Sequence, residues 1–506
     1  MAKATKKKKP TKSSKPSKPG KSAKPSKPKA NGTVSAWEQD PGSKDKPDGG
    51  QLIQVPTPVL GQSPFSIAIS NPPKAPNPTI YSPGTDEFRY WALAAALTRG
   101  KDFWGKQLPG VSWEVGNQLP VDMDHGEDLN AYYDRVGLRF FHGTAAGRTV
   151  FSCESPDVVC HEQGHAILDS IKPELWDAAS LEVAAFHESF GDMSAILTGL
   201  QVQSLRSNVL AETGGNFFQA SRLSRLAEQL GWAIRQSFPT AVEADCLRNA
   251  VNSFFYRDPQ TLPSNAPATS LSSEPHSFSR VFTGAFYEGL AGMFKIAGTN
   301  ESSLQQASLD MAKILTTAIK AADVVPGFYS QVAANMIDTA NSQFATNGYA
   351  QALRSAFIRH GILSPSSSLA PVQNIARAAM ANTTGTPREL PKLSLSITEF
   401  GLGIDSILVH SASDSARFNV AGAALSKGEV TAPGHQEEAK AFIEDLLRRG
   451  RLAVPNTKRD ARSAMVVTRA SAPEDHQTHT HELQKQGNDF VLKRVRIDCG
   501  FYCTSH

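Results

Sequence analysis

The amino-acid sequence predicts an α+β fold, in which a part containing strands precedes a mostly helical part and a small mixed segment follows. Before residue 160, the stretches 111–115 (VSWEV) and 128–143 (DLNAYYDRVGLRFFHG) are rich in aromatic residues and partly alternate between apolar and polar positions, as strands do. After Val158, apolar residues recur at intervals of three and four, the spacing of a helix with one buried face. The length of 506 residues suits two or three domains.

The individual elements follow from the same patterns. A helix is expected at 86–104, and Gly361 is suited to cap the end of a helix that begins near residue 349. The short apolar run 52–60 is expected to dock on the body. Further helices are expected at 216–238, 279–297, 308–322, 327–344 and 435–450, and further strands at 392–401 and 490–503.

Shifts in composition divide the chain into five parts. Residues 1–50 form a disordered Lys/Pro/Ser-rich tail, because such a sequence has too little apolar surface to bury. Residues 51–165 and 166–362 form the two halves of the main body, and a linker at 363–388 leads to an accessory segment of unknown role at 389–506.

The charge is unevenly distributed. Residues 1–30 hold 12 lysines and no acidic residue, so the remainder carries 40 basic and 48 acidic residues, a net charge of −8. The tail is therefore either a solubilising extension or a weak electrostatic contact to nucleic acid or an anionic surface. Since no aromatic residue interrupts the lysines, sequence-specific recognition of nucleic acid is not expected.

The absence of two sequence features indicates the compartment in which the protein is expected. The sequence shows neither the apolar core of a signal peptide nor about 18 consecutive apolar residues, so no transmembrane segment is expected. Five cysteines fit a reducing compartment and free thiols, and the cytoplasm is the expected location. The alternative is export without a cleavable signal, in which case Cys499 and Cys503 would be able to pair. The oligomeric state stays open.

The segment 158–169, VVCHEQGHAILD, carries the clearest chemical pattern. His161 and His165 are four residues apart and therefore share one helix face, where two imidazoles can grip one metal ion. Glu162 lies between them and can address a metal-bound water. A catalytic zinc needs a third protein ligand, and Glu188 and Asp192, four apart in AAFHESFGDMSAI, are candidates amid apolar residues. Glu188 would be the ligand, and Asp192 the acceptor for a ligand histidine.

His187 is a rival for the third ligand, but it lies about 100° around the helix from Glu188. A second possible metal group, His476, His479 and His481 in EDHQTHTHEL, is better interpreted as a polar loop, because no cysteine or carboxylate completes it.

The segment DVVCHEQGHAILD…HESFGD resembles the thermolysin family of zinc metallopeptidases and its fungal relatives. The resemblance covers roughly residues 86–362 and implies a two-lobed, thermolysin-like fold with one Zn²⁺ on His161, His165 and Glu188, and Glu162 as the general base. Asp192 would hold a ligand histidine in place from behind. Two histidines and a glutamate are the known zinc ligands of thermolysin itself.

Three further stretches resemble the family in the expected order. LNAYYDRVGLRFF is similar to the family's edge strand and implies that Asn130 and Ala131 bind the substrate main chain. CLRNAVNSFFYRDP implies that Arg248 holds a substrate carbonyl, and EPHSFSRVFTGAFYEGL implies that His276 steadies the transition state.

The sequence also departs from the family. The active-site tyrosine between the two zinc motifs is missing, with Trp176 nearby, and the only acid close to His276 is Glu274, two residues ahead. No acidic cluster for structural calcium follows Asp192, so calcium is not supported. The resemblance thus implies a zinc endopeptidase acting on a peptide or protein, and the alternative is a catalytically impaired zinc-binding protein of the same fold that serves as a binding module.

Overall fold

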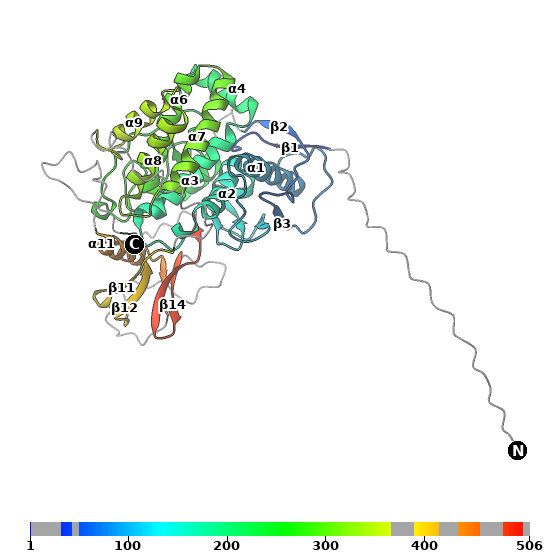
Figure 1. Cartoon of the computed structure of the whole chain (residues 1–506). Coiled ribbons are helices and arrows are strands. Elements are labelled where there is room, and N and C mark those ends of the chain that lie inside the picture. Colours follow the sequence, from blue (N-terminus) through cyan, green and yellow to red (C-terminus); the bar gives the residue numbers. More distant parts are fainter. Residues whose placement is uncertain (2–31, 43–49, 366–388, 414–433, 456–478, 499–506) are drawn as a thin grey trace.

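The computed structural model describes residues 1, 32–42, 50–365, 389–413, 434–455 and 479–498. It confirms a mixture of helices and strands (Figure 1). In Figure 1 the helices α6 to α9 gather at one end of the molecule, while the strands β11, β12 and β14 and the helix α11 form a separate layer at the other end. The predicted linker lies largely outside the described residues.

A five-stranded sheet, in the order β16-β5-β6-β4-β3, packs through β5 against the helix α2 (Pro156–Ile171). Its strands are β3 (Ile67–Asn71), β4 (Leu119–Asp122), β5 (Ala131–Tyr133), β6 (Leu138–Phe140) and β16 (Ile497–Asp498). The predicted strand at 111–115 is wrong. Trp113 is buried there, and its indole N–H donates a hydrogen bond to the carbonyl of Ser66 at 2.7 Å. Tertiary packing of this side chain therefore explains the apolar pattern without a strand.

The first strand lies within the predicted tail. Strand β1 (Thr33–Trp37) pairs antiparallel with β2 (Leu52–Pro56), and Val34 and Ala36 are fully buried. The prediction of a tail up to residue 50 is therefore wrong for residues 33–37. The expected docking of the run 52–60 is confirmed, because Val55 and Leu60 pack against the core of the body. Residues 2–31, which carry the lysines, lie outside the described residues.

Three long helices form the centre of the body: α1 (Asp86–Gln107), α2 (Pro156–Ile171) and α3 (Leu181–Gly199). Each begins at a side chain that caps the first turn: the oxygens of Thr85, Ser155 and Ser180 accept hydrogen bonds from backbone N–H groups inside the helix. The predicted helix at 86–104 is confirmed. Helix α3 is buried along its whole length, although it carries charged or polar side chains such as Glu182, His187 and Asp192 among its apolar residues.

The helical half follows. Its helices are α4 (Gln203–Thr213), α5 (Glu228–Ser237), α6 (Pro275–Ala297), α7 (Glu301–Ala321), α8 (Phe328–Gln343) and α9 (Tyr349–Arg359). The helices predicted at 279–297, 308–322, 327–344 and 349–361 are confirmed, and Gly361 has the left-handed φ of 69° expected after a helix end. The helix predicted at 216–238 is wrong in its first half, where turns and the strand β9 (Arg225–Leu226) precede α5.

Two short two-stranded sheets complete the main body. Strand β9 pairs with β10 (Arg248–Asn249), and β7 (His142–Ala145) pairs with β8 (Arg148–Phe151).

The described residues from 389 to 494 form a C-terminal unit with its own sheet, in the order β11-β12-β15-β14-β13. Its elements are β11 (Lys392–Ser396), β12 (Ser406–His410), α11 (His435–Arg448), β13 (Leu452–Ala453), β14 (His481–Gln486) and β15 (Asp489–Arg494). Phe442 and Ile443 of α11 are buried against the sheet. The predicted helix at 435–450 is confirmed, and the strand predictions at 392–401 and 490–503 are confirmed over shorter ranges.

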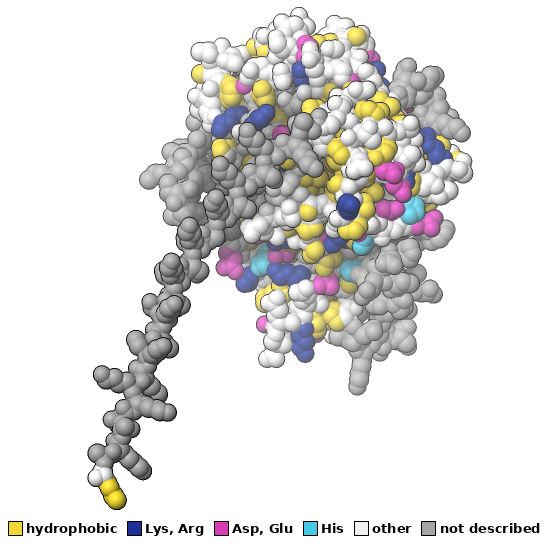
Figure 2. Space-filling model, turned by 90° about the vertical axis from the view of Figure 1, so that its right-hand side faces the viewer, with side chains coloured by type: hydrophobic (Ala, Val, Ile, Leu, Met, Phe, Trp, Pro, Cys, Tyr) yellow, Lys and Arg dark blue, Asp and Glu magenta, His cyan; other side chains and the backbone are white. Residues whose placement is uncertain are grey.

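The cysteines that the structure describes, Cys153, Cys160 and Cys246, are buried free thiols, and Cys499 and Cys503 lie outside the described residues. Within the described ranges, no helix combines the length and apolar character needed to cross a membrane. On the face drawn in Figure 2, basic and acidic side chains are interspersed.

Candidate metal centre

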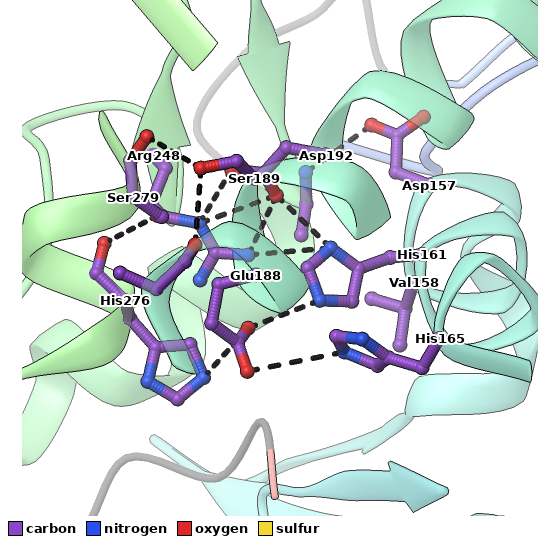
Figure 3. Close-up of polar contacts among 12 residues, drawn as sticks. Asp157, Val158, His161, His165, Glu188, Ser189, Asp192, Arg248, His276 and Ser279 are labelled. Carbon is purple, nitrogen blue, oxygen red and sulfur yellow. Dashed lines mark hydrogen bonds and ion pairs between the residues drawn. The ribbon is translucent and has the colours of Figure 1, made fainter. Parts of the chain in front are cut away.

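Helix α2 carries the first two candidate ligands. Ser155 caps it and Pro156 occupies its first turn, so the HEQGH segment falls in the middle of a regular helix. His161 and His165 project from one face with their rings 4.7 Å apart (Figure 3). His161, Glu162 and His165 are all buried, with 5% or less of each residue exposed.

Helix α3 brings the third candidate ligand beside them because two glycines let the helices approach closely. A Cβ atom at Gly191 of α3 would lie 2.5 Å from the ring of His161, and one at Gly164 of α2 would lie 2.8 Å from the Cβ of Ser194. Any larger residue at position 191 would push the imidazole aside. Packing therefore explains Gly191 in HESFGD, because the absence of a side chain there makes room for His161, which faces Glu188.

His161, His165 and Glu188 form a buried group that could hold a metal ion. One possible ligand atom from each lies within 4.8 Å of the others. The Nε2 atom of His161 is 3.3 Å from Oε2 of Glu188, and Nε2 of His165 is 3.9 Å from Oε1 (Figure 3). Among the residues that the structure describes, no other group of this kind is found.

The charges of the site suit a cation. Burial tends to raise the pKa of the Glu188 carboxyl, but the neighbouring histidines, His276 above all, outweigh it and hold that pKa well below its ordinary value. Burial lowers the pKa of His165 to about 3, so this imidazole is neutral, as a metal ligand must be. Burial also tends to lower the pKa of His161, but hydrogen bonds to Asp192 and Glu188 outweigh it and raise that pKa to about 9, so a metal ion would have to displace a proton from His161. The site thus holds a carboxylate and a neutral imidazole in a buried setting.

Asp192 lies behind His161, as predicted. Its Oδ1 is 3.0 Å from Nδ1 of His161, which leaves Nε2 facing Glu188. Burial tends to raise the pKa of Asp192, but Arg248 and His161 lower it to about 2. This contact orients the ring and is the usual support of a metal-binding histidine.

Arg248 lies beside Asp192. Its Nε is 3.0 Å from Oδ2 and its Nη2 is 2.7 Å from Oδ1 of Asp192, a bidentate ion pair. Its Nη2 is also 3.5 Å from Nδ1 of His161. Arg248 therefore helps to position His161 through Asp192. Its role in holding a substrate carbonyl stays a prediction.

His276 faces the site from the first turn of α6. Its Nε2 is 3.1 Å from Oε2 of Glu188, and its Nδ1 is 2.7 Å from Oε1 of Glu274. The other oxygen of Glu274 accepts a hydrogen bond from the N–H of Ser277 at 2.9 Å and caps the helix. Glu274 is thus the acid that orients His276, although only one residue separates the two in the sequence.

Asn130 and Ala131 lie where β5 begins, and both are buried. The side-chain oxygen of Asn130 accepts from the N–H of Ala131 at 2.8 Å, and its amide donates to Asp128. The prediction that this strand lies at a sheet edge is wrong for Tyr132 and Tyr133, because β16 pairs with them on the outer side. The substrate-binding role of Asn130 and Ala131 stays a prediction.

The residue that fastens β5 to the helix with the histidines was not found from the sequence. Asp169 lies four residues after His165 on α2 and accepts a hydrogen bond from the hydroxyl of Tyr133 at 2.8 Å. Its carboxylate also pairs with Arg135, whose Nη2 is 2.5 Å away. The sequence signal for this contact was an aspartate directly after the apolar run AIL (166–168), because a buried carboxylate requires a polar partner.

Two other predicted residues lie off the metal group. His187 is fully buried with its ring 6.0 Å from that of His165, and it is not part of the three-residue group. Trp176, near the position of the family's tyrosine, donates from its indole N–H to the carbonyl of Arg494 at 3.2 Å and so faces the C-terminal unit.

The histidine-rich stretch near residue 480 forms no metal group within the described residues. His481 begins β14 and packs on Phe442, whereas His476 lies outside the described residues.

Comparison with known proteins does not extend these observations. No family model matches the chain, and no curated protein matches it.

Proposed function

We propose that the chain is a zinc-dependent endopeptidase with a thermolysin-like, two-lobed body. The observation that carries the proposal is the convergence of two histidines from α2 and a carboxylate from α3, with Glu162 beside the first histidine and Asp192 behind it. Two histidines and one glutamate are the ligand set of several zinc peptidases, in which a water completes the coordination.

Two of the distances between candidate ligand atoms suit residues that would hold one small ion. Ligand bonds of about 2.0–2.1 Å place neighbouring ligand atoms of a tetrahedron about 3.4 Å apart. The distances of 3.3 Å and 3.9 Å from the histidine nitrogens to the oxygens of Glu188 are close to this value. Two nitrogen ligands and one carboxylate favour zinc over calcium, which takes six to eight oxygens.

Each side chain then has a role. A zinc ion held by His161, His165 and Glu188 would lower the pKa of its water and polarise a carbonyl oxygen. Glu162 is fully buried next to His161 and would take the proton of the attacking water and pass it to the leaving amine. His276, held by Glu274, would donate a hydrogen bond to the carbonyl oxygen as negative charge develops there.

The Glu162→Gln variant tests this assignment. The substitution keeps the size of the side chain and removes the base, so zinc should stay at one ion per chain while hydrolysis of casein or a fluorogenic peptide falls by about 10²–10⁴-fold. Glu174→Gln, which changes a carboxylate beyond the end of α2 that pairs with Lys172, is the control. If the wild type hydrolyses the peptide measurably, hydrolysis by Glu162→Gln at the same rate would show that the base is assigned wrongly.

One observation favours the alternative of a zinc-binding protein without turnover. The cavity beside Glu188 and His276 has a volume of only about 30 Å³. A peptide does not fit into this space, which residues of the C-terminal unit close on the side opposite Glu188 and His276.

A further inference from the structure

The small cavity owes its size to the C-terminal part of the chain. One side is lined by Glu188 and His276, and the other by side chains that follow residue 440, including Phe442, Arg494 and Ile497. About 30 Å³ is room for a water molecule or two. Ligand pockets usually measure about 300–1,000 Å³, so these side chains leave no room for a ligand on this side of Glu188 and His276.

Strand β16 also occupies the edge of the five-stranded sheet, next to β5. Ile497 of β16 pairs antiparallel with Tyr133, and Asp498 pairs with Tyr132. Without β16, β5 would be the edge strand of this sheet. Adding a strand to an exposed edge is a common way for a protein to hold an extended peptide. Strand β16 thus lies where an extended peptide would bind, and together with the C-terminal unit it forms a cover over the site.

Specific polar contacts hold this arrangement. Arg494 donates from Nε to the carbonyl of Trp176 at 2.7 Å, and the indole of Trp176 donates back to the carbonyl of Arg494 at 3.2 Å. Lys493 pairs with Asp177 at 2.7 Å. Trp176 and Asp177 both lie in the loop that joins the two ligand-bearing helices. The cover is therefore anchored directly beside the ligands.

Apolar contacts add to the anchor. Leu181 and Ala184, in the first turns of α3, are buried in one cluster with Phe442 and Leu446 of α11. Because α3 also carries Glu188, the core of the C-terminal unit extends onto the ligand helix itself. The C-terminal unit and the body thus meet in an interface that combines apolar contacts on both sides with buried hydrogen bonds.

We propose that the C-terminal unit, together with β16, is an autoinhibitory element of this chain, which occupies the position of the substrate backbone and must be displaced before a peptide reaches the site. The identity of the excluded molecule, a peptide, rests on the proposed function. The occlusion itself rests only on the cavity and the strand pairing.

The Ile497→Asp variant of the full chain tests the proposal. Ile497 is 2% exposed, so a carboxylate there opposes burial of β16 against the sheet. Asn488→Asp adds the same charge at the exposed turn between β14 and β15 and is the matched control. Two quantities are measured on protein with one zinc per chain: the affinity for a dipeptide hydroxamate, which needs access to the metal, and hydrolysis of a fluorogenic peptide.

Ile497→Asp should bind the hydroxamate at least tenfold more tightly than the wild type and hydrolyse the peptide at least tenfold faster, while Asn488→Asp should behave as the wild type. Equal hydroxamate affinity in the wild type and Ile497→Asp would overturn the proposal. Tighter hydroxamate binding without any hydrolysis would uphold autoinhibition and refute the peptidase function. Absence of bound zinc in the wild type would refute the proposed function at the start.

A milder variant covers the case in which Ile497→Asp loses its zinc or fails to fold. Lys493→Ala removes the ion pair with Asp177 at a partly buried position and leaves β16 intact. It should raise the hydroxamate affinity by about twofold to fivefold, since a partly exposed ion pair contributes only modestly to docking. An affinity equal to that of the wild type would then count against the proposed anchor.

Discussion

Replacing Asp192 with asparagine separates the two roles that the structure gives this carboxylate. The change keeps the shape of the side chain but removes the charge that faces both His161 and Arg248. Carboxylates that support metal-binding histidines typically contribute a factor of about 10–100 in metal affinity, or about 1.4–2.7 kcal/mol. We therefore expect the zinc affinity to fall by that factor.

The same change takes the carboxylate of Asp192 away from the buried guanidinium of Arg248. Removing one member of a buried ion pair costs about 3–5 kcal/mol of folding stability. Because the oxygen of asparagine still accepts one hydrogen bond, we expect the lower end, about 3 kcal/mol, in the zinc-free protein. The double variant Asp192→Asn/Arg248→Met also removes the buried positive charge and should recover part of the stability without recovering the zinc affinity.

Two measurements check these numbers. Zinc affinity is obtained by competition with a chromogenic chelator, and stability by denaturant unfolding of the zinc-free protein. Asp157→Asn is a suitable control. The carboxyl of Asp157, on α2, is buried like that of Asp192, but it accepts a hydrogen bond from the N–H of Ala227, away from the ligands. Zinc binding by Asp192→Asn within twofold of the wild type would refute the supporting role of this carboxylate.

Three further outcomes are expected. His276→Gln should lower turnover by about 10²–10³-fold with an unchanged zinc content, measured on the released Ile497→Asp chain. Removing zinc with a chelator should lower the melting temperature, because the ion binds only the folded site; an unchanged melting temperature would contradict the site. Burial raises the pKa of Glu438 to about 8, with Glu182 and Asp258 adding to the rise, so docking of the C-terminal unit should weaken as pH increases from about 4.5 to 8. Hydroxamate affinity should rise over that range relative to Glu438→Gln, whereas the exposed neighbour Glu437→Gln should follow the wild type.

The helices could be predicted where apolar spacing and burial agree. In α6, the apolar residues face the core at regular intervals, and the sequence pattern marks the element correctly. At 216–227 the same kind of residues are buried by turns instead. There the hydroxyl of Ser224 accepts from the N–H of Ser221, at 2.9 Å, and Ala227 has a left-handed φ of 52°. Local side-chain hydrogen bonds of this kind compete with a helix, and apolar spacing does not reveal them.

The candidate ligands could be found from the sequence because their geometry is local. His161 and His165 share a face by helical spacing alone, and Glu188 and Asp192 repeat that spacing on the next helix. The pairing of β16 with β5 could not be found in this way. Its partners are far apart along the chain, and the predicted strand at 490–503 does not by itself indicate which other strand it pairs with.

Ser180 shows how the cover and the ligand helix depend on one another. Its hydroxyl caps α3 by accepting from the N–H of Val183, and it donates to Glu438 of α11 at 2.5 Å. Helix α3 also packs on α2 and α6, contacts that do not involve the C-terminal unit. If the unit is displaced, Ser180 loses Glu438 but keeps its cap, so α3 and the position of Glu188 should persist. Opening of the site then requires only that the cover leave, because helices of the body hold the three candidate ligands together.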